Sequence, residues 1–193
     1  MKCCAKGILI SALVALGLSA GAASAKECAG VNFPDQAQVD GANLALNGLG
    51  LRLATMLKVK VYVAGLYVAK TSGDASAILG SGAPTELVLH FVRDVGADDV
   101  RKGFDEGFEK NSKAQLPALK ERISQLNSWI PDVKSGQKLT FIHKPGTGVQ
   151  VDVNGVVKGT IKGDDFAKAF LSIWLGDPPN SEVKTGLLGG ACG

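Results

Sequence analysis

Apolar and polar residues alternate with a period of two in the first and last parts of the chain, and recur at helical spacing in the middle. A period of two predicts strands, because successive side chains of a strand point to opposite faces of a sheet. Residues 31–39 alternate weakly and contain Pro34, which suits an edge strand. Asn154-Gly155, a strong signal for a tight hairpin turn, separates the last two strands. The predicted strands are residues 31–39, 42–47, 85–93, 138–143, 148–153 and 156–161.

A longer apolar run, residues 51–69, is predicted to fold back on itself. Strands seldom exceed about 10 residues, so a reversal near residues 56–58 is expected, although no Asn-Gly or Pro-Gly pair marks it. If the reversal centres on Leu57, Arg52 and Tyr62 lie opposite each other across a hairpin, with their side chains on one face. On one continuous strand the same two residues would lie about 33 Å apart.

The middle of the chain predicts amphipathic helices that cover a sheet. Pro117 is compatible with this because it falls in the first turn of its helix. Strands followed by helices and then by strands predict one α+β domain, with the helices on one face of an antiparallel sheet. The predicted helices are residues 74–79 with Asp74 as N-cap, 97–109, 115–129, 164–175 capped by Asp164-Asp165, and 181–188.

The first 25 residues have the pattern of a secretory signal peptide. Lys2 and Lys6 precede an apolar segment, residues 7–18, and Ala23-Ser24-Ala25 is a small-residue cleavage site. Removal of residues 1–25 leaves residues 26–193, an ordinary size for one domain. We therefore expect a soluble periplasmic or secreted protein without an integral membrane segment in the mature chain.

The charge and cysteine content narrow the classes of partner. The net charge is +3, aromatic residues are few and no basic stripe is present, so nucleic acid is not expected as a partner. Cys28 and Cys192 remain after cleavage, and a lone pair of this kind in an oxidising compartment indicates a disulfide bond. Two free thiols near the chain ends are the alternative.

Several kinds of catalytic or cofactor site lack their sequence pattern. His90 and His143 lie in predicted strands without cysteine or carboxylate partners at metal-ligand spacing, so structural roles are expected. No G-x-S-x-G nucleophile motif is present, and GLGLR lacks the Lys-Ser/Thr of a phosphate-binding loop. We therefore expect no metal and no cofactor.

Arg52 is the residue that these exclusions leave unexplained. It lies beside Leu51 and Leu53 in a run that is otherwise suited to burial, and a buried charge without a partner is costly. Together with the hydroxyl of Tyr62 it can hold a carboxylate or an oxyanion, because a guanidinium is a bidentate, permanently charged donor. The rest of such a pocket should be apolar. Alternatively, Arg52 pairs with a carboxylate elsewhere or extends to solvent.

Two stretches of the sequence are specific enough to suggest a family. They are LNGLGLR followed by VKVYVAGLYVAK, and VQVDVNGVVKGTIKGDDFAKAFLSIWLGDPP. Both resemble the chalcone isomerase-like proteins, in particular their secreted bacterial branch, and the resemblance runs from about Val39 to Gly189. It implies an open-faced β-sandwich of the chalcone isomerase type, in which a large antiparallel sheet carries a layer of helices and a ligand cleft lies between them.

The same resemblance implies roles for individual residues. Plant chalcone isomerases close a flavanone ring by intramolecular addition of a phenolate to an enone, and the arginine of their G-x-R motif, which matches Arg52, stabilises the oxyanion. Fatty-acid-binding members of the fold keep an arginine and a tyrosine that hold a carboxylate, and Arg52 with Tyr62 is similar to that arrangement. The other catalytic positions of the isomerases fall on Tyr62, near Asp98 or Asp99, near Glu106, and on Ile173, so they depart from the family's residues.

Three functions follow as hypotheses. The first is a periplasmic, non-catalytic binding protein for a small apolar anionic ligand such as a fatty acid, whose carboxylate Arg52 and Tyr62 hold. The second is an isomerase of the intramolecular lyase type, in which Arg52 is catalytic. The third is a structural or interaction protein without a ligand.

Overall fold

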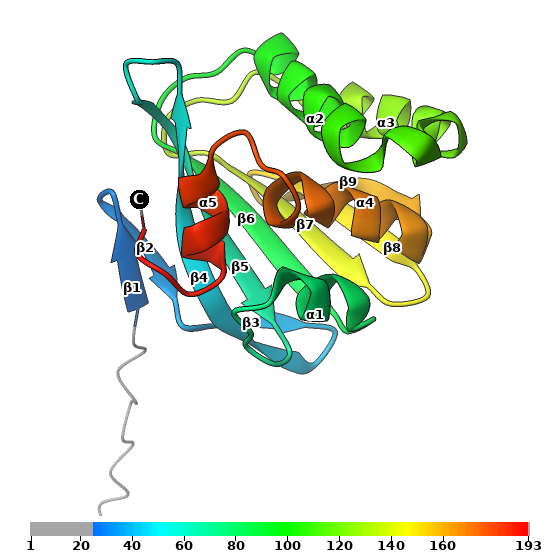
Figure 1. Ribbon diagram of the computed structural model, residues 1–193, viewed down its shortest axis with the longest axis horizontal. Coiled ribbons are helices and arrows are strands. Elements are labelled where there is room, and N and C mark those ends of the chain that lie inside the picture. The colour runs from blue at the N-terminus through cyan, green and yellow to red at the C-terminus, as the bar shows by residue number, and fades with distance from the viewer. Residues whose placement is uncertain (1–24, 193) are drawn as a thin grey trace, which may run out of the picture.

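The computed structural model describes residues 25–192 (Figure 1), so all of the predicted signal peptide except Ala25 lies outside the described residues. Its strands form a seven-stranded antiparallel sheet and a separate two-stranded hairpin. They are β1 (Ala25–Cys28), β2 (Val31–Pro34), β3 (Gln36–Val39), β4 (Ala42–Ala54), β5 (Val59–Val68), β6 (Thr85–Phe91), β7 (Lys138–Lys144), β8 (Gly148–Val153) and β9 (Val156–Lys162).

Strands that follow one another in the sequence are neighbours in the large sheet, which has the order β3-β4-β5-β6-β7-β8-β9. The predicted tight turn between β8 and β9 is confirmed, since φ is +52° at Asn154 and +85° at Gly155. Positive φ at both central positions is what a type I′ turn requires.

The predicted reversal within residues 51–69 is also confirmed. β4 ends at Ala54 and β5 begins at Val59, and the four residues between them form the turn. The register pairs Arg52 with Tyr62, as the hairpin prediction required.

Two strand predictions near the N-terminus are wrong. Residues 31–39 do not form one edge strand: the chain divides at Asp35 into β2, which pairs with β1, and β3, which is the edge of the large sheet. Residues 42–47 are only the first part of β4, which continues through a β-bulge at Asn47. The buried Asn47 side chain holds the bulge by hydrogen bonds to both backbone groups of Ser72 and to the carbonyl oxygen of Leu187.

The helices cover one face of the sheet (Figure 1), which confirms the α+β prediction. Asp74 caps the first of them as predicted, accepting a hydrogen bond of 2.8 Å from the backbone N–H of Ser76. Asp164-Asp165 do not cap theirs: Gly163 is the N-cap, and both acids lie in the first turn. The helices are α1 (Ala75–Gly80), α2 (Ala97–Ser112), α3 (Leu116–Trp129), α4 (Asp164–Leu175) and α5 (Ser181–Leu187), with a 3₁₀ turn at Lys113–Gln115. Within residues 25–192, no helix is long and apolar enough to cross a membrane.

Alternate residues of the strands supply two separate apolar clusters. On β5, Ala64 and Leu66 pack under the helices, whereas Val63 and Tyr67 face the opposite side. There the β1–β2 hairpin covers the sheet with Val31 and with Phe33, which lies against Gly65. Both faces of the β4–β5 region are therefore buried, although only one of them is covered by helices.

Cys28 on β1 and Cys192 form the predicted disulfide bond, with their Cα atoms 5.8 Å apart. The bond attaches the β1–β2 hairpin to the segment that follows α5, and Figure 1 shows the C-terminal end beside β2. Both ends of the described chain are thus fixed on the same side of the molecule.

Candidate functional site

A cleft of about 710 Å³ opens between the β4–β5–β6 end of the sheet and the helices α2 and α4. Its volume falls in the range of small-molecule sites. Most of its inner wall is apolar. Strands β5 and β6 and helices α2 and α4 supply this wall, with Val61, Leu89, Phe91, Val100, Phe104, Ile173 and Trp174.

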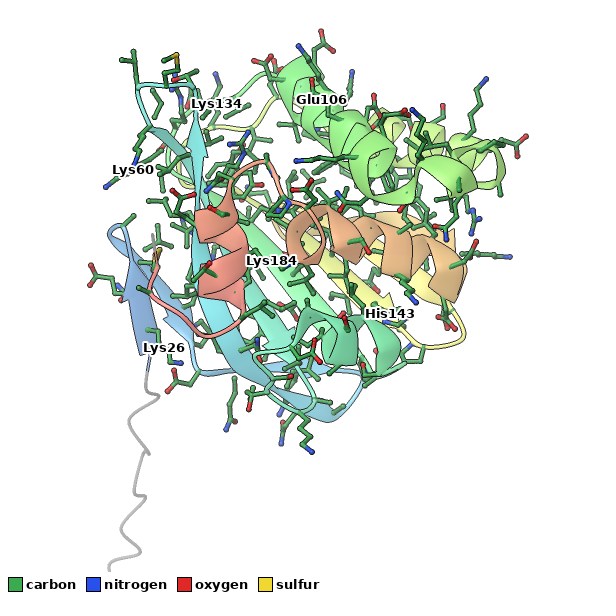
Figure 2. The ribbon with its side chains drawn as sticks, in the orientation of Figure 1. Lys26, Lys60, Glu106, Lys134, His143 and Lys184 are labelled. Atoms are coloured by element: carbon green, nitrogen blue, oxygen red, sulfur yellow. A yellow bond between two sulfur atoms is a disulfide. The ribbon has the colours of Figure 1, made fainter. Side chains whose placement is uncertain are left out.

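Arg52 and Tyr62 both line this cleft, on adjacent strands. A second β-bulge follows the pair, since the register moves from Arg52–Tyr62 to Leu53–Lys60 and skips Val61. Bulges re-aim side chains next to functional sites. Here the bulge turns Val61 toward the cleft and, as Figure 2 shows, leaves Lys60 pointing away from the helices.

The guanidinium of Arg52 is held by neutral groups. Its Nη1 donates to the carbonyl oxygen of Leu53 and, at 3.4 Å, to the side-chain oxygen of Asn180. Asn180 is itself bonded to the backbone of β4 through Leu51 and Leu53. Within residues 25–192 no salt bridge is recorded for Arg52, so the alternative that it pairs with a carboxylate of this chain is wrong for the described residues.

Asn180 reaches Arg52 because α5 packs directly on the backbone of β4. A Cβ added to Gly48 would meet the carbonyl oxygen of Gly186, and one added to Gly50 would meet that of Val183. The glycines of GLGLR therefore permit a close approach of helix and strand rather than phosphate binding. That approach places the start of α5, and with it Asn180, against the end of β4.

The phenol of Tyr62 is a neutral hydrogen-bond donor at the cleft wall. Its oxygen accepts a hydrogen bond of 3.0 Å from the indole N–H of Trp174, and an indole N–H only donates. Burial raises the pKa of Tyr62, outweighing the bond from Trp174 and the nearby charge of Arg52, which lower it. The phenolic proton therefore stays in place at neutral pH, and the hydrogen bond that the Tyr62 oxygen makes within residues 25–192 is the one it accepts from Trp174.

Charged side chains stand around this apolar wall, so the expectation that the rest of the pocket is apolar is only partly met. Arg93 also lines the cleft and is exposed. Within the described part of the chain, Arg52 and Arg93 are the cleft cations for which no ion pair is recorded. The other two form the pairs Lys110–Asp177 at 2.9 Å and Lys102–Glu106 at 3.9 Å.

The positions that the family resemblance implied on α2 and α4 also reach the cleft. Asp99, Glu106 and Ile173 are lining residues, whereas Asp98 is not among them. None of these three side chains is a phenol, an amide or an alcohol. At the positions that the resemblance implied on α2 and α4, the cleft therefore lacks neutral hydrogen-bonding groups.

The two histidines lie outside the cleft. The Nε2 of His143 is 3.0 Å from Asp164, which also accepts from the backbone N–H of Gly146. His90 packs against Phe33, and burial, with a smaller effect of Lys138, lowers its pKa. No group of metal-ligating side chains is found among residues 25–192.

Sequence reasoning missed two residues that shape the site, Trp174 and Asn180. Trp174 belongs to the stretch FLSIWLGDPP that carried the family resemblance, so a signal for it was present. Asn180 follows Pro178-Pro179 and gives no comparable signal, because its contact with Arg52 bridges more than one hundred residues of sequence.

Comparison with known proteins agrees with the fold. A family model described as chalcone isomerase-like matches residues 25–189. The fold is similar to that of a fatty-acid binding protein of Arabidopsis thaliana, with a TM-score of 0.66 and 18% sequence identity over 82% of this chain and 92% of that one. Among proteins with curated descriptions, no match is found.

Proposed function

The chain belongs to the chalcone isomerase-like family, and from this premise we propose that it is a non-catalytic binding protein for a small, largely apolar, anionic ligand such as a fatty acid. One observation carries the proposal: the Arg52 and Tyr62 donors line the same apolar-walled cleft. The similarity to a fatty-acid binding protein supports the proposal at the level of the fold.

Arg52 and Tyr62 hold the carboxylate in this proposal. Asn180 and Leu53 occupy Nη1 of Arg52, and within residues 25–192 no hydrogen bond is recorded for its Nη2 and Nε. These groups can donate to a carboxylate oxygen, and the phenol of Tyr62 can donate to the other. The apolar wall formed by α2 and α4 then contacts the hydrocarbon part of the ligand.

Catalysis of the isomerase type has less support. A kept arginine can stabilise an oxyanion, but Asp99, Glu106 and Ile173 replace the neutral hydrogen-bonding groups that the family resemblance implies. Tyr62, whose pKa is raised, is a poor base at neutral pH. We therefore keep the isomerase as the second candidate, on the single observation that Arg52 remains.

The proposed location is the periplasm, or the outside of the cell after secretion. It rests on the sequence pattern of residues 1–25 and agrees with a chain whose two described ends are joined by a disulfide bond, since such bonds persist in oxidising compartments. The intact mass of the protein recovered from a periplasmic extract would show cleavage after Ala25 or its absence.

Native mass spectrometry on protein purified from cells tests the proposed function. The expected result is a co-purified ligand, released on denaturation and identified as a carboxylic acid with a long apolar part. Calorimetry on delipidated protein with a series of fatty acids should then give saturable binding with a stoichiometry of one. Turnover of a chalcone without fatty-acid binding would favour the isomerase. The absence of both binding and turnover would favour a protein without a ligand.

A further inference from the structure

The β4–β5 hairpin extends beyond the rest of the sheet, at the upper left of Figure 1. Pairing between β5 and β6 begins only at Tyr62, so Val59 lies three residues farther along a strand, about 10 Å. Residues 55–58 close the hairpin and are called the hairpin tip below. The tip is therefore held away from the body of the protein.

Met56 and Leu57 stand at the hairpin tip, exposed to 100% and 86%. The other exposed large apolar side chains within residues 25–192 are Val156 and Val157, which are less exposed, at 58% and 56%. Single exposed apolar residues are ordinary, but an adjacent and nearly fully exposed pair on a projecting turn is a feature of interaction sites.

The backbone of the tip does not account for the apolar pair. The residues of the tip with positive φ angles are Thr55 and Lys58, at +62° and +50°. The turn is fixed by hydrogen bonds from Lys58 N to Thr55 O and from Leu57 N to the Thr55 hydroxyl. Polar residues would fit equally well in place of Met56 and Leu57. Because both positions are exposed to water, polar residues would also be favoured there.

The charges beside the tip restrict the partner. Lys58 and Lys60 are both exposed, and Figure 2 shows Lys60 pointing outward. Hydrogen bonds, and to a smaller extent the charge of Lys58, lower the pKa of the nearby Glu182. Lys58, Lys60 and Glu182 together still carry a net positive charge. A convex apolar tip flanked by cations fits a surface that is apolar within and anionic outside, which describes a lipid bilayer with anionic head groups.

We propose that the hairpin tip docks on an anionic lipid bilayer, with Met56 and Leu57 entering the acyl region and Lys58 and Lys60 on the head-group phosphates. Arg52, Ala54 and Thr55 of the same hairpin line the cleft. Docking therefore holds the cleft mouth at the membrane surface. This inference does not depend on the proposed ligand, because the tip binds the bilayer through residues outside the carboxylate site.

Co-sedimentation with vesicles of equal parts phosphatidylcholine and phosphatidylglycerol tests the proposal. Met56→Ser/Leu57→Ser should weaken binding at least about tenfold, since both apolar side chains are lost. The matched control is Val156→Ser/Val157→Ser, which removes the other exposed apolar pair and should leave binding unchanged. All proteins are compared after intact-mass measurement shows the same N-terminus, because residues 7–18 are themselves apolar.

Lys58→Gln and Lys60→Gln should each weaken binding about fivefold on these vesicles. The effect should shrink in high salt and should be absent on pure phosphatidylcholine. A local readout comes from Leu57→Trp, whose emission should shift to the blue and be quenched by brominated lipid. Val157→Trp serves as the control, with the same background from Trp129 and Trp174.

Three results would overturn the proposal. They are an emission spectrum of Leu57→Trp that vesicles do not change, equal losses for the two serine double variants, and a change of oligomeric state in Met56→Ser/Leu57→Ser without a change in vesicle binding. The last result would assign the tip to a protein partner. Fatty-acid binding measured in solution is unaffected by any of them, so the two proposals fail separately.

Discussion

The two faces of the large sheet are covered in different ways at its β4–β5 side. On one face the β1–β2 hairpin lies on the sheet, contributes Val31 and Phe33 to a closed apolar cluster, and is bonded through Cys28 to Cys192. On the other face the helices bury most of the sheet but leave the cleft that contains Arg52 and Tyr62. The first cover is cross-linked by a disulfide bond, whereas the helices are held on the sheet by packing and by hydrogen bonds such as that from Trp174 to Tyr62.

This difference separates stability from binding. A closed, cross-linked face can contribute to the free energy of unfolding without touching a ligand. An open cleft, lined by an arginine with few hydrogen-bond partners, buries less apolar surface and contributes less to that free energy. Substitutions on the hairpin face should therefore change unfolding, and substitutions in the cleft should change affinity. Five predictions test that separation.

The largest effect is expected from Cys28→Ser/Cys192→Ser. The bond closes a loop with a sequence separation of 164 residues, and its removal should lower the free energy of unfolding by up to about 4–5 kcal/mol in the chain-entropy model. Denaturant titration of the variant and of the wild type, both without reductant, measures the difference. Ligand affinity at low temperature should be unchanged, and a parallel loss of affinity would show that the two faces are coupled.

Arg52→Ala should have the converse effect. Binding of a fatty acid should weaken by about 2–5 kcal/mol, because the ligand carboxylate loses its charged partner, while the denaturation midpoint stays near that of the wild type. Calorimetry gives the affinity. The control is Arg93→Ala, which removes an exposed arginine of the same cleft. This variant should lose much less fatty-acid affinity. Equal losses in the two variants would mean that only the overall charge of the cleft matters.

Tyr62→Phe should affect both quantities and so marks the limit of the separation. Loss of the phenolic donor should weaken fatty-acid binding by about 0.5–3 kcal/mol. Loss of its oxygen leaves the buried indole N–H of Trp174 without an acceptor, which should lower stability by about 1 kcal/mol. Calorimetry and denaturation on the same preparation measure both. Unchanged affinity with lowered stability would leave Tyr62 a structural role only.

Gly155→Val should destabilise the fold by about 1 kcal/mol or more without changing affinity. Gly155 has φ of +85°, which a β-branched residue adopts only with strain. Gly80→Val is the matched control, since Gly80 ends α1 with open space around it and without a positive φ. A thermal melt compares the two, and identical midpoints would show that the turn tolerates side chains.

The smallest effect concerns pH and Asp164. The hydrogen bond from His143, and then that from Gly146, lower the pKa of Asp164 below its usual value. A lowered pKa means that the ionised carboxylate stabilises the fold above the ordinary aspartate range, and that this contribution is lost as the pH falls through the lowered pKa. Asp164→Asn should melt slightly below wild type at neutral pH and converge with it in acid. A gap that widens in acid would contradict this sign.

Local patterns were sufficient to predict much of the fold. The Asn154-Gly155 turn and the N-cap at Asp74 depend on neighbouring residues only, and both are found. The β4–β5 reversal followed from strand length alone, even though its tip uses Thr55 and Lys58 at positive φ without a glycine. The single strand over residues 31–39 failed because the hydrophobic pattern does not reveal that β2 leaves the large sheet at Asp35 to pair with β1.

The site was predicted in part for the same reason. Arg52 and Tyr62 are ten residues apart, and one hairpin register places them together. Trp174 and Asn180 come from helical segments that lie more than one hundred residues farther along the chain than the hairpin residues they contact. Their contacts depend on how α4 and α5 lie on the strands, and Gly48 and Gly50, which allow that approach, read in the sequence as a loop motif.

The bond between Cys28 and Cys192 also gives the described chain the topology of a ring. A protease that cuts one exposed connection, such as the tip of the β4–β5 hairpin, opens the backbone but does not separate the pieces. Each piece keeps one of the two cysteines, so both remain one molecule until a reductant is added. A nicked protein of this kind runs as a single species on a denaturing gel and divides into two only after reduction.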